Sequence, residues 1–147
     1  MTEFERSSFT TAQLPVGERF GAWQQSFSAL FDVALPQKKS TDRFHANLDS
    51  CLLNQQIILG HCRSSAQSFE RSSLRTAQDG LDYFLIQTHL HGSQKLWRGN
   101  KTVISKPGDL MVIDLAERHR AEATDFANLT LIIPRPLLAP LLLDPDS

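Results

Sequence analysis

The stretch Leu81-Asp82-Tyr83-Phe84-Leu85-Ile86-Gln87-Thr88-His89-Leu90-His91 decides the fold class of this chain. Its side chains alternate with a period of two, which is typical of a β-strand. In an extended strand, one face carries Phe84, Ile86, Thr88 and Leu90, and the other carries Leu81, Tyr83, Leu85, Gln87, His89 and His91. Neither face is clearly hydrophilic. We therefore predict a central strand that other parts of the protein cover on both faces.

Turn sequences follow this strand at short intervals. Arg98-Gly99-Asn100 separates two short β-like segments, residues 95–97 and 102–104, and therefore predicts a hairpin. Lys106-Pro107-Gly108-Asp109 predicts a second turn. Further strands are expected at residues 44–49, 52–62, 110–114 and 127–133, with a polar loop at 117–120 and a helical start at 137–139. Many short strands of this kind predict a mainly β domain with flanking helices, built as an antiparallel jelly roll or small barrel. The alternative is an open antiparallel sheet with one covered face.

The first part of the chain differs from this pattern. Residues 1–13 are polar and rich in Ser and Thr, and we predict a flexible arm there. Pro15 suits the first turn of a helix, because its missing N–H has no partner at that position. An apolar stripe with helical spacing follows at Phe20, Trp23, Phe27, Leu30 and Phe31. The stripe predicts an amphipathic helix packed on the outside of the β structure, for example on the back of a sheet.

Composition narrows the class of protein. The 147 residues fit one domain on the usual scale of about 100–200 residues. The net charge is −1 and the cations are interleaved with anions, which argues against nucleic-acid binding by this segment itself. Cys51 and Cys62 lack the Cys-x-x-Cys spacing of a zinc or redox motif. The chain starts with neither an apolar signal segment nor a membrane span, so we expect a cytoplasmic protein without membrane contact.

Three motifs together resemble a known family. They are residues 15–23, residues 79–92, and the turn and strand of residues 106–114, later followed by 131–135. In this order they are similar to the AraC-binding-like domain, the N-terminal module of AraC-type bacterial transcription regulators. The resemblance covers about residues 14–140. It implies a cupin-like jelly roll whose interior holds a small effector.

The resemblance also implies partners. Regulators of this type form homodimers, often through a pair of helices after the barrel. They contact DNA through a C-terminal domain with two helix-turn-helix units. The sequence ends at Ser147, before such a domain, and residues 141–147 would begin the linker to it. DNA binding is thus expected only for the parent protein.

The effector site is predicted from strand faces. Binding sites for small molecules are mostly apolar with a few polar groups that orient the ligand. We predict that Tyr83, Leu85, Gln87, His89, Trp97, Met111 and Ile113 bind the effector. The alternative is that these side chains simply fill the core. Arg71 and Arg75 precede the central strand and either meet an acidic effector or are solvated.

His89-Leu90-His91 is the sharpest chemical motif, because both imidazoles would point the same way on a strand. Metal-binding cupins add a Glu and a further His to such a pair, and the corresponding stretches here, residues 93–96 and 109–112, carry neither. We therefore predict no metal and no cofactor. His61 and Cys62 are adjacent on a predicted strand and would point to opposite faces, which argues against a nucleophile and base pair.

These patterns predict an effector-sensing domain without catalysis. The effector would favour one arrangement of arm, barrel and dimer helices, with residues 1–13 folding over the pocket. Two other functions stay open. One is a metal-dependent cupin enzyme, such as a dioxygenase or isomerase. The other is a dimerisation module with a filled barrel and no ligand.

Overall fold

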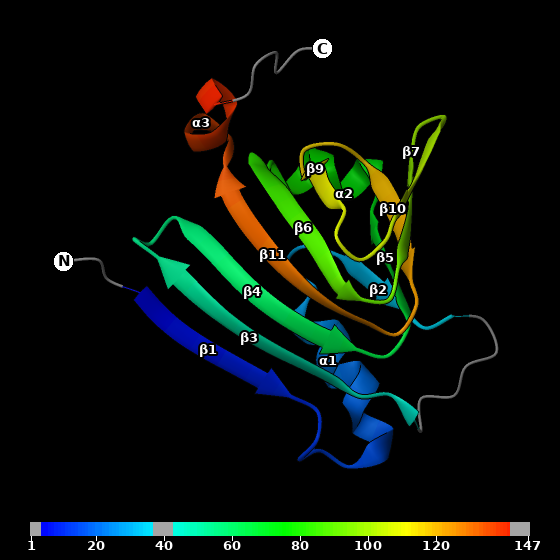
Figure 1. Cartoon of the computed structure of the whole chain (residues 1–147). Coiled ribbons are helices and arrows are strands. Elements are labelled where there is room, and N and C mark those ends of the chain that lie inside the picture. Colours follow the sequence, from blue (N-terminus) through cyan, green and yellow to red (C-terminus); the bar gives the residue numbers. More distant parts are fainter. Residues whose placement is uncertain (1–3, 37–42, 142–147) are drawn as a thin grey trace.

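Two antiparallel β-sheets form the body of the molecule (Figure 1). The computed structural model describes residues 4–36 and 43–141. Sheet A has the strand order β1-β3-β4-β11-β6-β9, and sheet B has the order β2-β5-β10-β7-β8. The strands of sheet A are β1 (Phe4–Thr10), β3 (Ala46–Leu53), β4 (Ile57–Ser64), β6 (Tyr83–His91), β9 (Leu110–Asp114) and β11 (Phe126–Pro134). Those of sheet B are β2 (Asp32–Ala34), β5 (Gln67–Arg71), β7 (Gln94–Arg98), β8 (Lys101–Ser105) and β10 (His119–Ala123).

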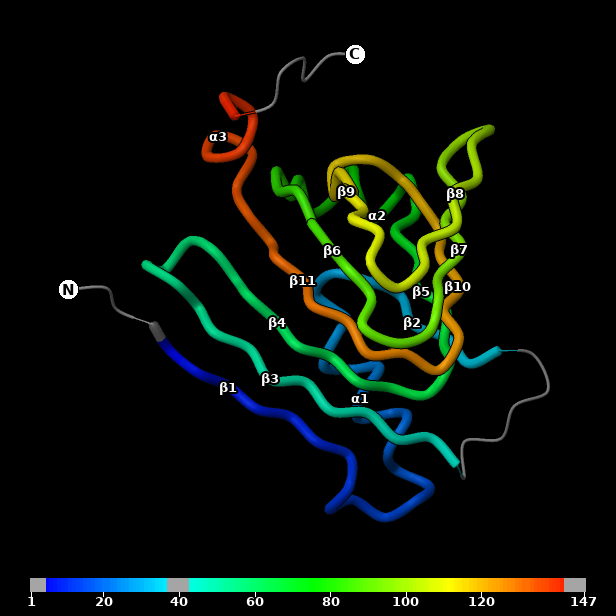
Figure 2. Tube along the Cα trace, in the orientation of Figure 1, coloured from blue at the N-terminus to red at the C-terminus, as the bar shows by residue number. Residues whose placement is uncertain are grey.

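The last eight strands have the connectivity of a jelly roll. Their orders are β4-β11-β6-β9 in one sheet and β5-β10-β7-β8 in the other. The chain therefore crosses between sheets at every step except β7 to β8, as in a double-sheet jelly roll. The predicted cupin-like jelly roll is confirmed, and the alternative of an open single sheet is wrong. Figure 2 follows these crossings and shows the β7–β8 hairpin extending beyond its neighbours.

Strand β6 lies between β11 and β9, as a central strand should. Leu85 and His89 point inward and are 4% and 2% exposed. Among the described residues, the outer face is covered where the strand begins, because Phe84 packs there with Ile133 and Leu138. Leu90, near the end of the strand, is 54% exposed. The prediction that both faces of this strand are covered is thus confirmed for the first part of the strand alone.

The prediction of a flexible arm is wrong for residues 4–10, and residues 1–3 lie outside the described residues. Residues 4–10 form β1, which pairs with β3 along its whole length. Ser8 Oγ donates a hydrogen bond to Asp49 Oδ1 at 2.7 Å, and the ring of Phe9 lies 5.8 Å from that of Trp23. Ser and Thr side chains of the edge strand β1 form hydrogen bonds to its neighbour β3. A polar composition therefore does not show that the segment is flexible.

The predicted N-terminal helix is present but short. A 3-10 turn, η1 (Val16–Glu18), leads into α1 (Arg19–Ser26). Trp23 is fully buried, and its Nε1–H donates to Gln67 Oε1 of β5 at 2.9 Å. Phe27, Leu30 and Phe31 of the stripe face the space between the sheets, and the ring of Phe20 packs edge-to-face on that of Phe44 at 5.1 Å. The stripe therefore closes the interior, instead of lying on the back of one sheet.

Several elements were not predicted, among them the strands β2, β5 and β10 and the helix α2 (Ser73–Asp79). Residues 119–120, expected in a loop, begin strand β10, whose inward positions are His119, Ala121 and Ala123. Small alanines between charged residues hid its alternation. The helix α2 begins after Ser72, whose Oγ accepts from Arg75 N–H at 3.1 Å, and ends at Gly80.

The predicted turns are confirmed. In the β7–β8 hairpin, Arg98 pairs with Lys101 across a two-residue loop that begins with Gly99 at φ 59°. In the second turn Gly108 has φ 93°, which glycine adopts readily. After β11 the chain forms α3 (Arg135–Leu138) and η3 (Ala139–Leu141). Most of the predicted linker, residues 142–147, lies outside the described residues. No helix within the described ranges is long and apolar enough to cross a membrane.

Candidate functional site

A cavity of about 280 Å³ lies between the two sheets. Its walls come from the segment at the end of α1, from β3, β4, β6, β9 and β11 of sheet A, and from β5, β7 and β10 of sheet B. Protein interiors pack to the density of organic crystals, with few voids larger than a water molecule. A cavity of this size in a small domain therefore marks a candidate binding site.

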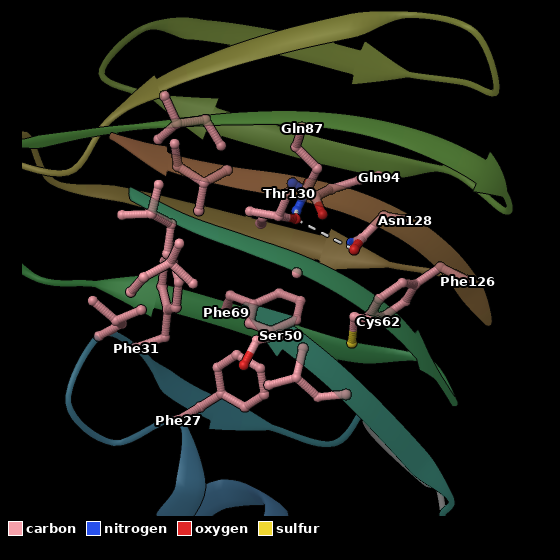
Figure 3. A pocket seen from close by; sticks show the side chains of 18 of the residues that line it. Phe27, Phe31, Ser50, Cys62, Phe69, Gln87, Gln94, Phe126, Asn128 and Thr130 are labelled. Atoms are coloured by element: carbon pink, nitrogen blue, oxygen red, sulfur yellow. Dashed lines mark hydrogen bonds between the residues drawn. The ribbon is translucent and has the colours of Figure 1, made fainter. Parts of the chain in front are cut away.

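One side of the cavity is aromatic (Figure 3). Phe69 of β5 lies at the centre of this side, with its ring 6.4 Å from Phe27, 5.6 Å from Phe31 and 6.2 Å from Phe126. All three pairs are edge-to-face. Such a cluster offers both ring faces and ring edges to a flat molecule.

The other side carries a short chain of hydrogen bonds (Figure 3). Gln87 Nε2 donates to Thr130 Oγ1 at 2.9 Å, and Thr130 Oγ1 donates to Asn128 Oδ1 at 3.3 Å. Gln87 Oε1 is buried and has no hydrogen-bond partner among the described residues. A buried acceptor without a partner costs free energy, so a bound donor at this point would be stabilised.

The part of the cavity wall formed by residues 4–36 and 43–141 carries no Asp, Glu, Lys or Arg side chain. Its titratable imidazole is His119, whose Nδ1–H donates to the Glu117 carbonyl oxygen at 3.2 Å. Burial lowers the pKa of His119, and the charges of Arg71 and Arg98 lower it further against the opposing effect of the Glu117 hydrogen bond. The ring is therefore neutral at pH 7, and the wall as a whole is uncharged.

The structure places some of the seven predicted site residues in the cavity wall and the others outside it. Leu85, Gln87 and Ile113 line the cavity. His89 and Met111 are buried but lie outside its wall, and Tyr83 is half-buried against the core.

Trp97 points away from the cavity, so its predicted place there is wrong. The inward residues of β7 are Gln94 and Leu96, and the period of two turns Trp97 outward. Its ring lies 5.0 Å from Lys95 Nζ and 5.1 Å from the Arg120 guanidinium.

Several residues of the wall were not predicted. Phe27 and Phe31 belong to the helical stripe that the sequence pattern assigned to the core. The period of two on β11 places Phe126, Asn128, Thr130 and Ile132 on one face, and all four line the cavity. That alternation is visible in the sequence. The sequence does not show, however, that this face of the strand is the inner one.

Arg71 is buried and does not line the cavity, so the prediction that it is solvated is wrong. Its side chain is fully buried and donates to the carbonyl oxygens of Leu115 at 2.8 Å and Leu30 at 2.7 Å. It also forms two hydrogen bonds with the Asp79 carboxylate, at 2.9 and 3.0 Å. Arg75 pairs with Asp32 at 2.6 Å.

The two histidines of the His-x-His motif have different surroundings. His89 is 2% exposed and neither ring nitrogen has a partner among the described residues, whereas His91 is exposed. The register of β6 against β11 shifts between them, because His91 pairs with Ala127 and His89 with Asn128. Burial lowers the pKa of His89. No group of three or more His, Cys, Asp or Glu side chains within residues 4–36 and 43–141 could hold a metal ion.

Cys62 provides a chemical test of the cavity wall. Burial raises the pKa of its thiol to about 12, whereas Cys51 is half-exposed on the same sheet. Since only the thiolate is nucleophilic, we expect iodoacetamide at pH 8 to alkylate Cys62 at least about a hundredfold more slowly than Cys51. Mass spectrometry of the Cys51→Ser and Cys62→Ser variants measures the two rates separately. Equal rates would show that the wall around Cys62 is open to water.

Comparisons with known proteins identify a family and solved structures that this chain resembles. The family model of the AraC-binding-like domain matches residues 23–146. The crystal structure of the AraC-like transcriptional activator CuxR superimposes with a TM-score of 0.84 at 25% identity, over 92% of this chain and 49% of that chain. The EutQ protein of Clostridium difficile gives a TM-score of 0.47 at 13% identity, over 63% of this chain and 70% of that chain. No curated protein matched.

This chain thus spans about half the length of the CuxR chain, by the 49% coverage. The family match extends from α1, which closes the cavity, through all eight strands of the jelly roll and on past β11. With most of its residues matched, the chain belongs to the AraC-binding-like domain family.

Proposed function

We propose that this chain is the effector-binding regulatory domain of an AraC-type transcription regulator, and that the effector occupies the cavity between the sheets. The observation that carries the proposal is the cavity itself, with one aromatic side and one polar side. Apolar walls with a few placed polar groups are characteristic of small-molecule sites. The jelly roll of an AraC-type domain surrounds it on both sides.

Occupancy of this cavity would act on several elements together. A ligand would touch Phe27 and Phe31 after α1, and Asn128 and Thr130 on β11. Strand β11 runs directly into α3, the last described helix. A ligand shifts a conformational equilibrium only by its difference in affinity for the two states. Strand β11 is therefore the proposed route from the cavity to the chain after α3. The predicted cover by residues 1–13 is replaced in this proposal, because β1 is held in sheet A.

The partners of the longer protein follow from family membership. We propose that DNA contact belongs to a part of the regulator outside these residues, that the regulator is a homodimer, and that it acts in the cytoplasm. Two alternatives are weaker. A metal-dependent cupin enzyme needs ligands beyond His89 and His91, and a pure dimerisation module leaves the cavity without a role.

The Gly60→Leu variant tests the cavity directly. Gly60 is buried on β4 and lines the cavity, and a Cβ atom there would meet Leu48 Cδ1 at 3.5 Å, an ordinary contact. Leucine therefore fits the backbone while its side chain fills the ligand space. We first expect a hit from a thermal-shift screen of small aromatic compounds, sugars, amines and fatty acids. A ligand at 100 times its Kd adds about 2.7 kcal/mol of stability, or several degrees in Tm. That shift should vanish in Gly60→Leu.

The matched control is His61→Leu, on the same strand but facing outward. It should bind the hit like the wild type. A hit that binds equally well to Gly60→Leu would place the ligand elsewhere and contradict the proposal. A fall in Tm on adding a chelator would instead favour the metal-dependent alternative. The absence of any hit, with a Tm that falls on dilution, would favour the dimerisation module.

A further inference from the structure

We infer that the cavity selects uncharged, flat aromatic molecules that donate a hydrogen bond, and rejects carboxylates and ammonium compounds of the same size. This inference rests on the proposed function, because it assumes that the cavity is the effector site. It follows from the charge, the shape and the unpaired acceptor of the wall.

Charge is the first argument. A charged group moved from water into a site without a partner pays a large desolvation cost. The wall supplies no charged side chain to offset that cost, and its His119 is neutral. Arg71, which lies beside His119 in the paired strands, is already bonded to Asp79 and two carbonyl oxygens.

Arg98 is a cation whose charge acts on His119 of the cavity wall. It has no ion-pair partner among the described residues, and it is close enough to His119 to lower the pKa of that ring. It does not line the cavity, however. A carboxylate on the polar side of the cavity, beside Gln87 and Asn128, would therefore have no cation in the described wall to pair with.

Shape is the second argument. An apolar cavity of about 150 Å³ is known to hold benzene. The cavity here is about 280 Å³, and four phenylalanines surround it. This space suits a bicyclic aromatic molecule or a substituted single ring. The edge-to-face arrangement around Phe69 leaves the ring faces and edges that a flat guest would contact.

The unpaired acceptor is the third argument, and it sets the polarity of the ligand. Gln87 Nε2 donates to Thr130 Oγ1, and the Thr130 hydroxyl donates to Asn128 Oδ1. This leaves Gln87 Oε1 as a buried acceptor without a partner among the described residues. Gln87 lines the cavity, so a rotation of its amide that brings Oε1 to the cavity surface would let it accept from a ligand hydroxyl or N–H, whereas an ether or carbonyl oxygen has no proton to donate.

Four probes of nearly equal size separate these requirements. They are 2-naphthol, 2-methoxynaphthalene, 2-naphthoate and 2-naphthylmethylammonium, titrated into the chain at pH 7 by calorimetry. We expect 2-naphthol to bind about three- to tenfold more tightly than 2-methoxynaphthalene, the usual effect of one hydrogen bond. The two ions should bind at least about a hundredfold more weakly than 2-naphthol, because neither finds a partner for its charge.

Variants then assign the preference to Gln87. In Gln87→Leu the ratio of the Kd values of 2-methoxynaphthalene and 2-naphthol should fall to about one. Thr88→Val, the outward neighbour on β6, should leave the ratio unchanged, and Gly60→Leu should remove binding of all four probes. If Gln87→Leu fails to fold, the ranking of the probes on the wild-type chain still decides the inference.

Some outcomes would overturn the inference and leave the proposed function standing. Tight binding of 2-naphthoate that Gly60→Leu removes would show that the cavity takes an anion. Equal affinities of 2-naphthol and 2-methoxynaphthalene would show that Gln87 selects no donor. Failure of all four probes, while a hit from the wider screen is blocked by Gly60→Leu, would reject this ligand class alone. Any tight binding that persists in Gly60→Leu would contradict the proposed site as well.

Discussion

Replacing Arg71 with methionine is expected to lower the free energy of unfolding by about 3–5 kcal/mol, because each buried acceptor left without a donor costs about 1–3 kcal/mol. Methionine replaces the aliphatic part of the side chain but leaves three groups without their donor, the carbonyl oxygens of Leu30 and Leu115 and the partly exposed Asp79 carboxylate. These groups connect the segment after α1, the loop after β9 and the end of α2. Urea unfolding followed by circular dichroism measures the loss.

Arg75→Met is the matched control. Arg75 sits on α2 and pairs with Asp32, whose side chain is 58% exposed. Exposed ion pairs contribute only about 0–1 kcal/mol, so this variant should stay close to the wild type. Similar losses in the two variants would contradict the role assigned to Arg71. Arg71→Lys should recover only part of the stability, since one ammonium cannot reproduce the fork of a guanidinium.

The same ion pair predicts how stability depends on pH. The hydrogen bond from Arg71 holds the pKa of Asp79 below its ordinary value of 3.8. A carboxyl with a lowered pKa in the folded state contributes stability that is complete above its unfolded pKa and is lost as the pH falls through its folded pKa. The wild type should therefore lose more stability than Asp79→Asn as the pH falls below about 4. Parallel curves for the two proteins would contradict this assignment.

Gly92→Ala is the second substitution expected to have a large effect, a loss of more than about 3 kcal/mol. Gly92 connects β6 to β7 with φ 77°, and a Cβ atom there would lie 2.1 Å from the carbonyl oxygen of Asp125. A left-handed backbone alone costs a residue with a side chain about 1–2 kcal/mol. The collision is with backbone, and it adds to this cost because the turn between β10 and β11 must move.

Gly99→Ala provides the comparison. Gly99 has φ 59°, but a Cβ atom there would have nothing within 4 Å. It should lose about 1–2 kcal/mol, from the left-handed backbone alone. Thermal unfolding of both variants separates the backbone conformation from the collision. A Gly92→Ala variant as stable as Gly99→Ala would show that the turn gives way easily. Since β11 begins at Phe126, a displaced turn should also weaken ligand binding in the cavity.

The strand pattern of residues 81–91 was sufficient to predict the interior face of β6. Side chains two residues apart share a face, so Leu85, Gln87 and His89 all point inward as expected. The same rule failed for Trp97, because the sequence did not show which face of β7 turns inward. It also missed β10, because two of its inward residues are alanines, whose small side chains give only a weak apolar signal in an alternating pattern.

The candidate site was predicted only in part for a similar reason. Leu85, Gln87 and Ile113 were expected and line the cavity, but Phe27, Phe69 and Phe126 complete its aromatic side from segments far apart in the sequence. No local pattern distinguishes a phenylalanine that fills a core from one that borders an empty space. The distinction depends on whether the facing residue is large or small, and that residue lies on another strand.

The sequence by itself predicted a mainly β jelly roll and the alternation along strands such as β6, because periods and turn residues are local in the chain. The family was predicted from the resemblance of three motifs. The tertiary structure decided which faces meet, that Arg71 is a buried tie between three segments, and that residues 4–10 are an edge strand. It also decided that an uncharged cavity remains between the sheets. Those features depend on packing between residues distant in sequence, and the volume left between two sheets is fixed by all of their facing side chains together.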